Sequence, residues 1–300
     1  MSGGLPDQYL FLDLHSSDSL RHALTVMATA FEAAGLNSAS LDARFLLHGI
    51  LNCDAAALMR DPLQPIGENA LALTAAARRR LRHEPVARIL GRREFYGRPF
   101  LVTPDVLDPR ADTECVVDLA LEIVRAEFAP EGPVTIADIG VGSGAIIVTM
   151  LAELPNARGV ATDVSAKALA VARENAAELG VMDRLTLIET RGLCGVKDQF
   201  NVIVSNPPYI ATAEMAVLPF DVRDYDPQVA LNGGPDGLAV YREIAREISS
   251  FATSYWIVLE VGAGQAAAVE QIFAEVGAIA GHRRKDLGGH DRAVALQIHR

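Results

Sequence analysis

The fold is decided by the stretch Val202-Ile203-Val204-Ser205-Asn206-Pro207-Pro208-Tyr209. Its run of β-branched residues is typical of a strand that is buried on both faces, as in a parallel sheet. Two prolines follow, and proline lacks the N–H that a strand needs to continue its pairing. Asn206 is therefore predicted at the carboxyl end of a strand, which is the edge where ligands bind in open α/β sheets.

Strands and helices alternate on both sides of this stretch, which is the pattern of an α/β domain with a mostly parallel sheet. The expected strands cover residues 134–139, 159–162, 185–188, 201–205, 255–261 and 293–298, and the expected helices cover residues 115–128, 145–154, 165–179, 238–249 and 265–276. Residues 210–236 are predicted to form a long loop that serves as a lid or as a wall for substrate.

The region before this domain has a different pattern. Apolar residues at helical spacing predict a small bundle over residues 18–83, as in the helix that carries Leu20, Leu24, Met27 and Phe31 on one face. The arginines near residue 80 are interpreted as a solvated helix end, or alternatively as a docking patch for an acidic partner. Glycines and prolines then punctuate residues 84–109, where strands at 86–90 and 100–103 are predicted to form a β-hairpin linker.

Composition argues against several classes of protein. The chain has 300 residues, of which half are hydrophobic, and 27 basic against 38 acidic residues give a net charge of −11. Phosphate binding needs a basic surface, so we expect no direct nucleic-acid partner. The three cysteines, Cys53, Cys115 and Cys194, show neither disulfide nor metal-ligand spacing, and we expect no metal.

The start of the chain has neither the basic nor the apolar region of a signal peptide. No apolar run reaches the length of a membrane span. We therefore expect a cytoplasmic protein that has no membrane partner. We also expect a monomer, although the sequence does not determine the oligomeric state.

A glycine-rich turn stands between the first expected strand and its helix, in the sequence Asp138-Ile139-Gly140-Val141-Gly142-Ser143-Gly144-Ala145. Glycines allow a tight turn and close approach of a ligand, while the helix N-terminus offers free N–H groups. Asp163 ends the next strand, where a carboxylate can accept hydrogen bonds from both ribose hydroxyls of an adenosine. The alternative is a purely structural turn with Asp163 as a helix cap.

Two kinds of adenosine cofactor fit this turn. The spacing of Gly140, Gly142 and Ala145 also fits the fingerprint of a dinucleotide-binding site, and an NAD-dependent oxidoreductase is a second hypothesis. Asp138 opposes it, because a carboxylate there could meet a cationic amino group. The sequence from Asn206 to Tyr209 opposes it as well, because it has no evident part in hydride transfer.

Together these features resemble the class I S-adenosylmethionine-dependent methyltransferases that act on amino or amide nitrogens. An amide nitrogen is a poor nucleophile, because its lone pair is delocalised into the carbonyl. The side-chain oxygen of Asn206 and the main-chain carbonyl of Pro207 can accept its two N–H bonds and fix it for in-line attack. Pro208 stiffens the loop, and Tyr209 can pack on the planar amide.

Further motifs narrow the resemblance to the HemK/PrmC family of protein-(glutamine-N5) methyltransferases. They are the stretches 84–91 and 93–95, Asp112-Thr113-Glu114, Ser205 to Ile210, Asp226-Pro227, 230–231, 233–238, Leu259-Glu260-Val261-Gly262 and Asp291-Arg292. The resemblance covers essentially the whole chain. It implies methylation of the glutamine in the Gly-Gly-Gln motif of class I peptide chain release factors, with S-adenosyl-L-methionine as donor and S-adenosyl-L-homocysteine as product.

The resemblance also implies an architecture and a site. The fold is a class I methyltransferase, Rossmann-like, with a mostly parallel seven-stranded sheet at 110–300, a linker at 84–109 and a substrate-docking helical domain at 1–83. The catalytic and substrate-binding residues are Asn206, Pro207, Pro208 and Tyr209, and the cofactor-binding residues are Gly140, Val141, Gly142, Ser143, Gly144, Asp163 and Asn206.

The chain departs from the family where the third strand ends. Glu189-Thr190-Arg191-Gly192 stands where an Asp followed by an aromatic residue is usual, so no cofactor role is assigned to Thr190 or Arg191. Two alternatives stay open beside the oxidoreductase. One is a methyltransferase acting on adenine N6 in nucleic acid, and the other is a family member that binds a release factor without catalysis.

Overall fold

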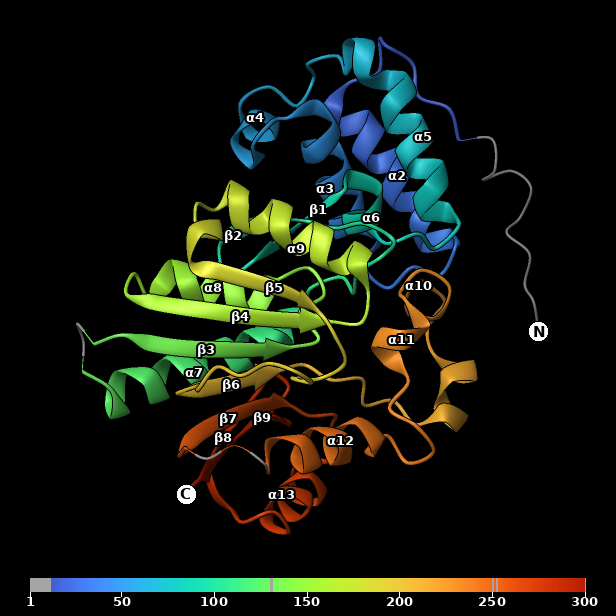
Figure 1. Ribbon diagram of the computed structural model, residues 1–300. Helices are drawn as coiled ribbons and strands as arrows, with labels where there is room; N and C mark the ends of the chain where they lie inside the picture. Colours follow the sequence, from blue (N-terminus) through green and yellow to red (C-terminus); the bar gives the residue numbers. More distant parts are fainter. Residues whose placement is uncertain (1–11, 130–131, 250, 252, 300) are drawn as a thin grey trace. The chain divides into compact units, whose positions relative to one another are not determined.

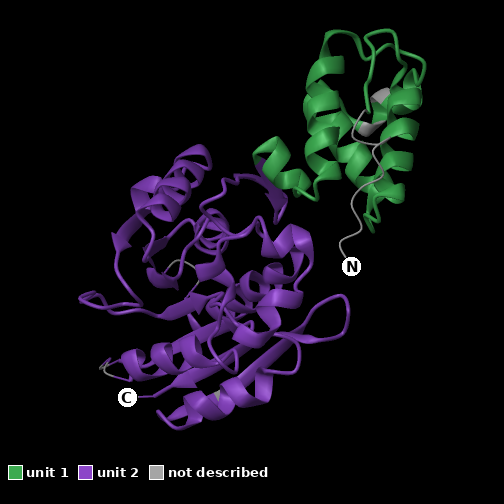
Figure 2. Cartoon of the chain, turned by 90° about the vertical axis from the view of Figure 1, so that its right-hand side faces the viewer, with its two compact units in different colours: residues 1–91 green, residues 92–300 purple. Residues whose placement is uncertain are grey.

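The computed structural model describes residues 12–129, 132–249, 251 and 253–299. The chain forms two compact units, Met1–Gly91 and Arg92–Arg300 (Figure 2). Residues 1–11, on which the expected absence of a signal peptide rests, lie outside the described residues. None of the helices in the described part of the chain combines the length and the apolar character that crossing a membrane requires.

The first unit is the helical bundle that the sequence predicted. It contains α2 (Leu20–Ala33), α3 (Ala39–Leu51), α4 (Ala55–Arg60), η1 (Gly67–Asn69), α5 (Ala70–Leu81) and α6 (Val86–Leu90). Ser19 begins the first of these helices, and its hydroxyl accepts the N–H of His22 at 3.2 Å. Met27 and Phe31 are fully buried with Leu46, Leu47 and Leu73, so the helices share one apolar core.

Two features of the first unit differ from the expectations. Arg80 is not on a solvated helix end, because it is buried and its Nε donates to Asp42 Oδ2 at 2.8 Å. The strand predicted over residues 86–90 is wrong, because this segment is the helix α6. Pro85 has the φ that suits a helix start, and Gly91 ends the helix in the left-handed region at φ +72°.

The second unit begins with the predicted β-hairpin. Its strands β1 (Arg92–Phe95) and β2 (Arg98–Leu101) are antiparallel, and Phe95 and Phe100 pack edge to face with ring centroids 5.9 Å apart. The hairpin starts later than expected, because residues 86–90 belong to the first unit.

A seven-stranded sheet forms the centre of the second unit, with strand order β5-β4-β3-β6-β7-β9-β8 (Figure 1). The strands are β3 (Val134–Ile139), β4 (Ala157–Asp163), β5 (Leu185–Glu189), β6 (Val202–Ser205), β7 (Tyr255–Glu260), β8 (Ala278–Lys285) and β9 (Asp291–Ile298). The first five are parallel, and β9 runs antiparallel to both of its neighbours. The predicted fold class is confirmed.

Helices cover both faces of the sheet. One face packs on α7 (Glu114–Glu127), α8 (Ala145–Glu153) and α9 (Ala166–Glu178), and the other on α12 (Ala239–Ile248) and α13 (Ala266–Ala274). Alternate residues of β6 enter opposite cores: Val202 and Val204 enter the first, and Ile203 enters the second. This double burial explains the apolar run before Asn206.

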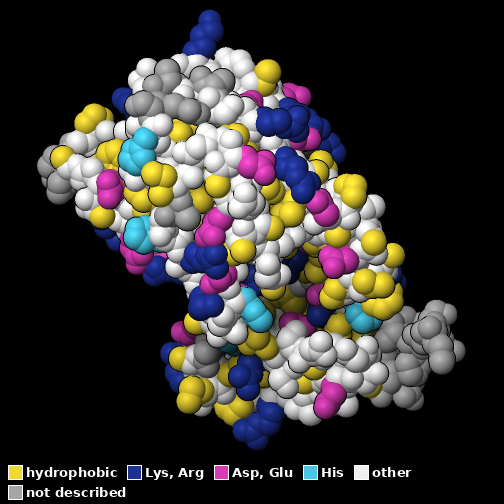
Figure 3. All heavy atoms as spheres, turned by 90° about the horizontal axis from the view of Figure 1, so that it is seen from below, with side chains coloured by type: hydrophobic (Ala, Val, Ile, Leu, Met, Phe, Trp, Pro, Cys, Tyr) yellow, Lys and Arg dark blue, Asp and Glu magenta, His cyan; other side chains and the backbone are white. Residues whose placement is uncertain are grey.

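The predicted long loop at 210–236 contains short helical turns, η4 (Thr212–Val217), α10 (Phe220–Arg223) and α11 (Gln228–Leu231). Ile210 is anchored by its N–H to the carbonyl of Leu231 at 3.0 Å. At the surface, Lys and Arg side chains lie among Asp and Glu side chains on the face shown in Figure 3. Pairs such as Arg283 with Glu270 neutralise part of the basic charge.

Candidate active site

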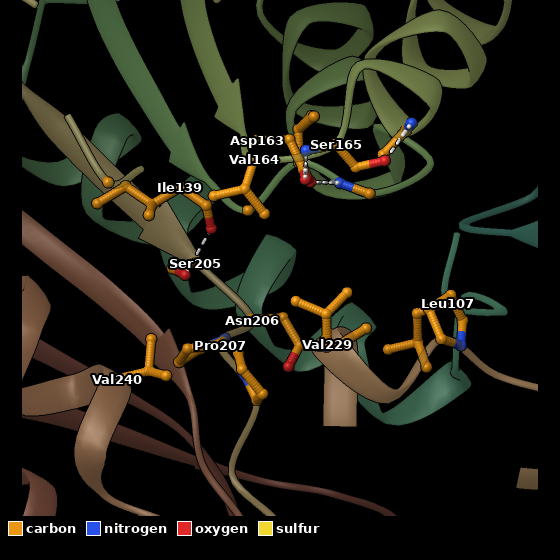
Figure 4. Close-up of a pocket in the computed structure, with 18 of the residues that line it drawn as sticks. Leu107, Ile139, Asp163, Val164, Ser165, Ser205, Asn206, Pro207, Val229 and Val240 are labelled. Carbon is orange, nitrogen blue, oxygen red and sulfur yellow. Dashed lines mark hydrogen bonds between the residues drawn. The ribbon is translucent and has the colours of Figure 1, made fainter. Parts of the chain in front are cut away.

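A cavity of about 1180 Å³ opens at the carboxyl ends of β3, β4 and β6 (Figure 4). Its volume slightly exceeds the range of about 300–1,000 Å³ that is usual for small-molecule sites. Asp163 and Val164 lie on one side of it, and Asn206 and Pro207 lie on the other. The structure therefore brings the glycine turn, the acid after the second strand and the Asn-Pro-Pro stretch to one place.

The glycine turn forms one wall of the cavity through Gly140, Val141, Gly142 and Ser143. Gly140 and Gly142 have φ of +76° and +53°, and a Cβ at either position would meet nothing within 4 Å. This open space leaves the backbone accessible to a ligand. Gly144 is not among the lining residues, because it faces inward and a Cβ there would lie 3.1 Å from Val148 Cγ2.

Asp163 ends β4 and ties the glycine turn to the next helix. Its Oδ2 accepts the N–H of Gly142 at 3.0 Å, and its Oδ1 accepts the N–H of Ser165 at 2.9 Å. Ser165 in turn caps α9 by accepting the N–H of Ala168. A carboxylate has about four acceptor sites, so Asp163 keeps capacity for ligand hydroxyls beside these two bonds.

Asn206 follows β6 directly, as predicted. Ser205 Oγ donates to the Ile139 carbonyl at 2.7 Å, which ties the end of β6 to the end of β3. Asn206, Pro207 and Pro208 line the cavity, but Tyr209 is not among the lining residues. The Tyr209 ring packs on the second core, and its hydroxyl lies 3.4 Å from Glu260 Oε1.

The backbone of Gly233 and Gly237 packs closely against the carbonyl groups of Pro208 and Tyr209. A Cβ at Gly233 would lie 2.6 Å from the Pro208 carbonyl oxygen, and one at Gly237 would lie 2.3 Å from the Tyr209 carbonyl oxygen. Gln265 Nε2 donates to the same Tyr209 oxygen at 3.0 Å. Only glycine permits so close an approach, so the 233–238 motif has a structural explanation.

The far end of the cavity contains residues to which the sequence assigned no role. Thr190 and Arg191 line it together with Glu243 and Glu247 of α12. Arg191 Nη1 donates to Glu243 Oε2 at 3.0 Å, and Glu247 accepts the N–H of Leu193 at 2.8 Å. The atypical residues after the third strand, Thr190 and Arg191, thus line the cavity next to α12, whose Glu243 and Glu247 form hydrogen bonds with this segment. The atypical residues could be recognised in the sequence. Their contact with α12 could not be predicted, because that helix lies about 50 residues further along the chain.

Near the cavity, the carboxyl groups of Asp138 and Glu260 are buried, and no Lys or Arg nitrogen of the described residues pairs with either of them. Burial raises the pKa of Asp138 to about 7, and raises the pKa of Glu260 to about 7 as well. Asp138 is 1 % exposed and is not among the residues that line the cavity. In this structure it therefore lies behind the glycine turn rather than facing a ligand.

Thr113 and Arg110 also line the cavity, from the segment before α7. Arg110 Nη2 pairs with the buried Asp226 at 2.6 Å and so connects this segment to the 210–236 loop. Within the described residues, no group of three or more His, Cys, Asp or Glu side chains is placed to hold a metal ion.

Comparison with known proteins gives matches over most of the chain. The family model of the PrmC N-terminal domain matches residues 22–91, and that of the methyltransferase small domain matches residues 114–218. The catalytic domain of hMettl16 in complex with the MAT2A 3'UTR hairpin 6 superposes with a TM-score of 0.54 at 15% identity, covering 77% of this chain and 81% of that chain. That likeness shows the fold alone.

Curated relatives are far more similar. A release factor glutamine methyltransferase of Bradyrhizobium diazoefficiens is 41% identical, over 95% of this chain and 97% of the relative. A protein of the same name from Cereibacter sphaeroides is 42% identical, over 95% of this chain and 99% of the relative. This chain therefore belongs to the release factor glutamine methyltransferase family.

Proposed function

We propose that the chain transfers a methyl group from S-adenosyl-L-methionine to the side-chain amide nitrogen of the glutamine in the Gly-Gly-Gln motif of class I peptide chain release factors. The observation that carries this proposal is the meeting of the Gly140–Ser143 turn, Asp163 and Asn206–Pro208 around one cavity. Family membership supports the same reaction.

The cavity fits an adenosine cofactor on grounds of its own geometry. The open positions at Gly140 and Gly142 expose backbone that a ligand can approach, and Asp163 retains acceptor capacity for ribose hydroxyls. When bound, the cofactor supplies a methyl group that its sulfonium already activates. No strong general base is then required of the protein, because the methylated amide nitrogen is acidic and can lose its proton to water.

The protein's task is to fix the substrate nitrogen. Asn206 Oδ1 and the Pro207 main-chain carbonyl accept the two N–H bonds of the glutamine amide, which aims the nitrogen at the methyl group. These acceptors also favour the positive charge that develops on the nitrogen during attack. The buried Ser205 bond to Ile139 and the close-packed glycines hold this loop in one geometry.

Mass spectrometry of a release factor after incubation with the chain and S-adenosylmethionine tests this proposal. We expect a gain of one methyl group on the Gly-Gly-Gln glutamine, and none in a release factor with that glutamine replaced by alanine. Oligonucleotides that contain adenine serve as parallel substrates. Methylation of these and not of the release factor would instead favour the nucleic-acid alternative, and retention of NAD without S-adenosylmethionine would favour the oxidoreductase.

A further inference from the structure

We propose that Thr113 and Glu260 form a hydrogen-bond relay with Asn206 that fixes which end of the Asn206 side-chain amide faces the cavity. Both are positioning residues in this proposal, which rests on the proposed function of Asn206. Asn206 Nδ2 lies 3.3 Å from Thr113 Oγ1. Three motifs that are far apart in the sequence, 112–114, 205–210 and 259–262, thus meet at one point.

Thr113 and Glu260 are buried, so the loss of a hydrogen bond by either side chain would be costly in free energy. Thr113 is 4 % exposed and Glu260 is 2 % exposed, and buried polar groups are costly when they lack partners. Burial raises the pKa of Glu260, and the Thr113 side chain is the largest of the influences that oppose this rise, which indicates that the two side chains lie close together. The Tyr209 hydroxyl donates to Glu260 Oε1 at 3.4 Å. Glu260 Oε2 has no hydrogen-bond partner among the described residues, so it is the acceptor that the proposal assigns to the Thr113 hydroxyl.

Arg292, the cationic side chain that influences the pKa of Glu260, forms ion pairs with Asp112 and Asp286 instead. Arg292 Nη2 lies 2.9 Å from Asp286 Oδ2 and 3.5 Å from Asp112 Oδ2, and its Nη1 donates to the Val261 carbonyl at 3.3 Å. Within the described residues, no guanidinium or ammonium nitrogen lies within ion-pair distance of Glu260. Its carboxylate therefore acts on Thr113 and Tyr209 as a hydrogen-bond acceptor.

The direction of the relay follows from counting donors. An ionised carboxylate only accepts, and a threonine hydroxyl has one proton to donate. If Thr113 gives that proton to Glu260, its oxygen can only accept from Asn206. The Asn206 NH₂ group must then face Thr113, which turns Oδ1 toward the cavity.

A flipped Asn206 would be unproductive. Its NH₂ group would then meet the NH₂ group of the substrate glutamine, and two donors cannot bond to each other. The relay therefore selects the orientation in which Asn206 can accept a substrate N–H. Positioning errors of this kind typically cost about 100-fold in rate.

Replacing Thr113 by valine and by serine tests the relay. Valine keeps the shape but cannot accept from Asn206, so Thr113→Val should lower kcat about 10–100-fold with the KM for S-adenosylmethionine within about twofold. Thr113→Ser should retain near-normal kcat. Thr149→Val is the matched control, because Thr149 is a fully buried threonine of α8 that does not line the cavity.

Two outcomes would overturn the relay: full activity of Thr113→Val, or equal losses in the serine and valine variants. A wild-type chain that methylates no release factor would instead contradict the proposed function. Retained binding of S-adenosylmethionine by Thr113→Val, measured by equilibrium dialysis, shows that the variant is folded.

The pH profile of Glu260→Gln supplies a second test that does not depend on the valine variant. Burial, the largest cause, raises the pKa of Glu260 to about 7, and Asp112 adds to the rise. Thr113, Arg292 of β9 and the hydrogen bond from Tyr209 lower it, and Tyr241 is the other titratable neighbour. Wild-type kcat should rise with pH through about 7 as the carboxylate ionises, and Glu260→Gln should lose this rise. An identical pH profile in both proteins would contradict the relay.

Discussion

Asn206 is the residue in which the strand pattern, the cavity and the proposed chemistry coincide. Its backbone position follows from the end of β6, and its side chain lies beside Thr113 at the cavity wall. The position of Asn206 was predictable from sequence, because a buried strand must end before two prolines. Its orientation was not, because Thr113, which lies 93 residues earlier in the chain, reaches Asn206 only through folding.

Asn206→Ala should abolish methyl transfer and leave cofactor binding largely intact. The change removes the acceptor that holds the substrate amide, and losing one such preorganised group typically costs about 100- to 1,000-fold in kcat. Initial rates on a release factor together with equilibrium dialysis of S-adenosylmethionine measure both effects. Activity equal to wild type would refute the role of this side chain.

Asp163→Ala should instead weaken cofactor binding. It removes acceptors for ribose hydroxyls and also releases the N–H of Gly142, and charge-assisted hydrogen bonds of this kind contribute about 1.5–3 kcal/mol. We expect the dissociation constant of S-adenosylmethionine to rise about 10- to 100-fold. Asp183→Ala, in the turn before β5, is the control and should bind normally; equal affinity in the two variants would exclude the assignment.

Asp138 makes stability depend on pH. Burial raises its pKa from 3.8 to about 7, the nearby Ile147 backbone opposes this rise, and the negative charge of Asp163 adds to it. Between these values the folded chain holds a proton that the unfolded chain has lost, so the free energy of unfolding falls as pH rises from about 4 to 7. At about 1.4 kcal/mol for each pH unit, the loss amounts to about 4 kcal/mol.

Asp138→Asn should therefore be more stable than wild type at pH 8, with a smaller difference at pH 4. Urea unfolding followed by the fluorescence of Trp256, the single tryptophan of the chain, measures this in the second unit. A stability difference that is the same at both pH values would contradict the assignment.

At the scale of elements, strands with two apolar faces were predictable, whereas the charged edge strand β8 was not. The run at 202–205 identifies β6 because both of its faces are buried. Strand β8 was missed, since it is an edge strand that ends in His-Arg-Arg-Lys and pairs with β9 alone. Residues 86–90 were misassigned, because Val86 and Ile89 suit a strand as well as a buried helix turn.

The packing of the Gly233–Gly237 segment on the Asn206 loop can be tested by replacing Gly237 and a control glycine, Gly180, with alanine. Gly237→Ala should reduce kcat at least about tenfold, because its Cβ would lie 2.3 Å from the Tyr209 carbonyl and displace the loop. Gly180→Ala is the matched control: its φ of +70° resembles the +74° of Gly237, but its Cβ would meet nothing within 4 Å. An equal loss of kcat in the two variants would show that the positive φ, and not the contact with the Tyr209 carbonyl, causes the loss.

At the scale of the whole molecule, the cavity lies in the second unit, and the first unit has a core of its own. We propose that the first unit docks the body of the release factor. A single glutamine side chain offers little surface for specificity, whereas stable protein recognition typically buries about 800 Å² on each partner. Composition and periodicity predicted the bundle, but they carry no information on what it binds.

Deleting residues 1–91 tests this division of roles. The KM for an intact release factor should rise at least about tenfold, while kcat/KM for a short Gly-Gly-Gln peptide should change little. Trp256 fluorescence confirms that the remaining unit is folded. Equal losses on the two substrates would contradict a docking role for the first unit.

The central claim is that the Asn206 cavity methylates a glutamine amide of a release factor. It is tested most directly by peptide mass spectrometry of a class I release factor incubated with S-adenosylmethionine and either wild type or Asn206→Ala. We predict one added methyl group on the Gly-Gly-Gln glutamine with wild type and none with the variant. The claim would be contradicted if the glutamine stayed unmodified after incubation with wild type that binds S-adenosylmethionine.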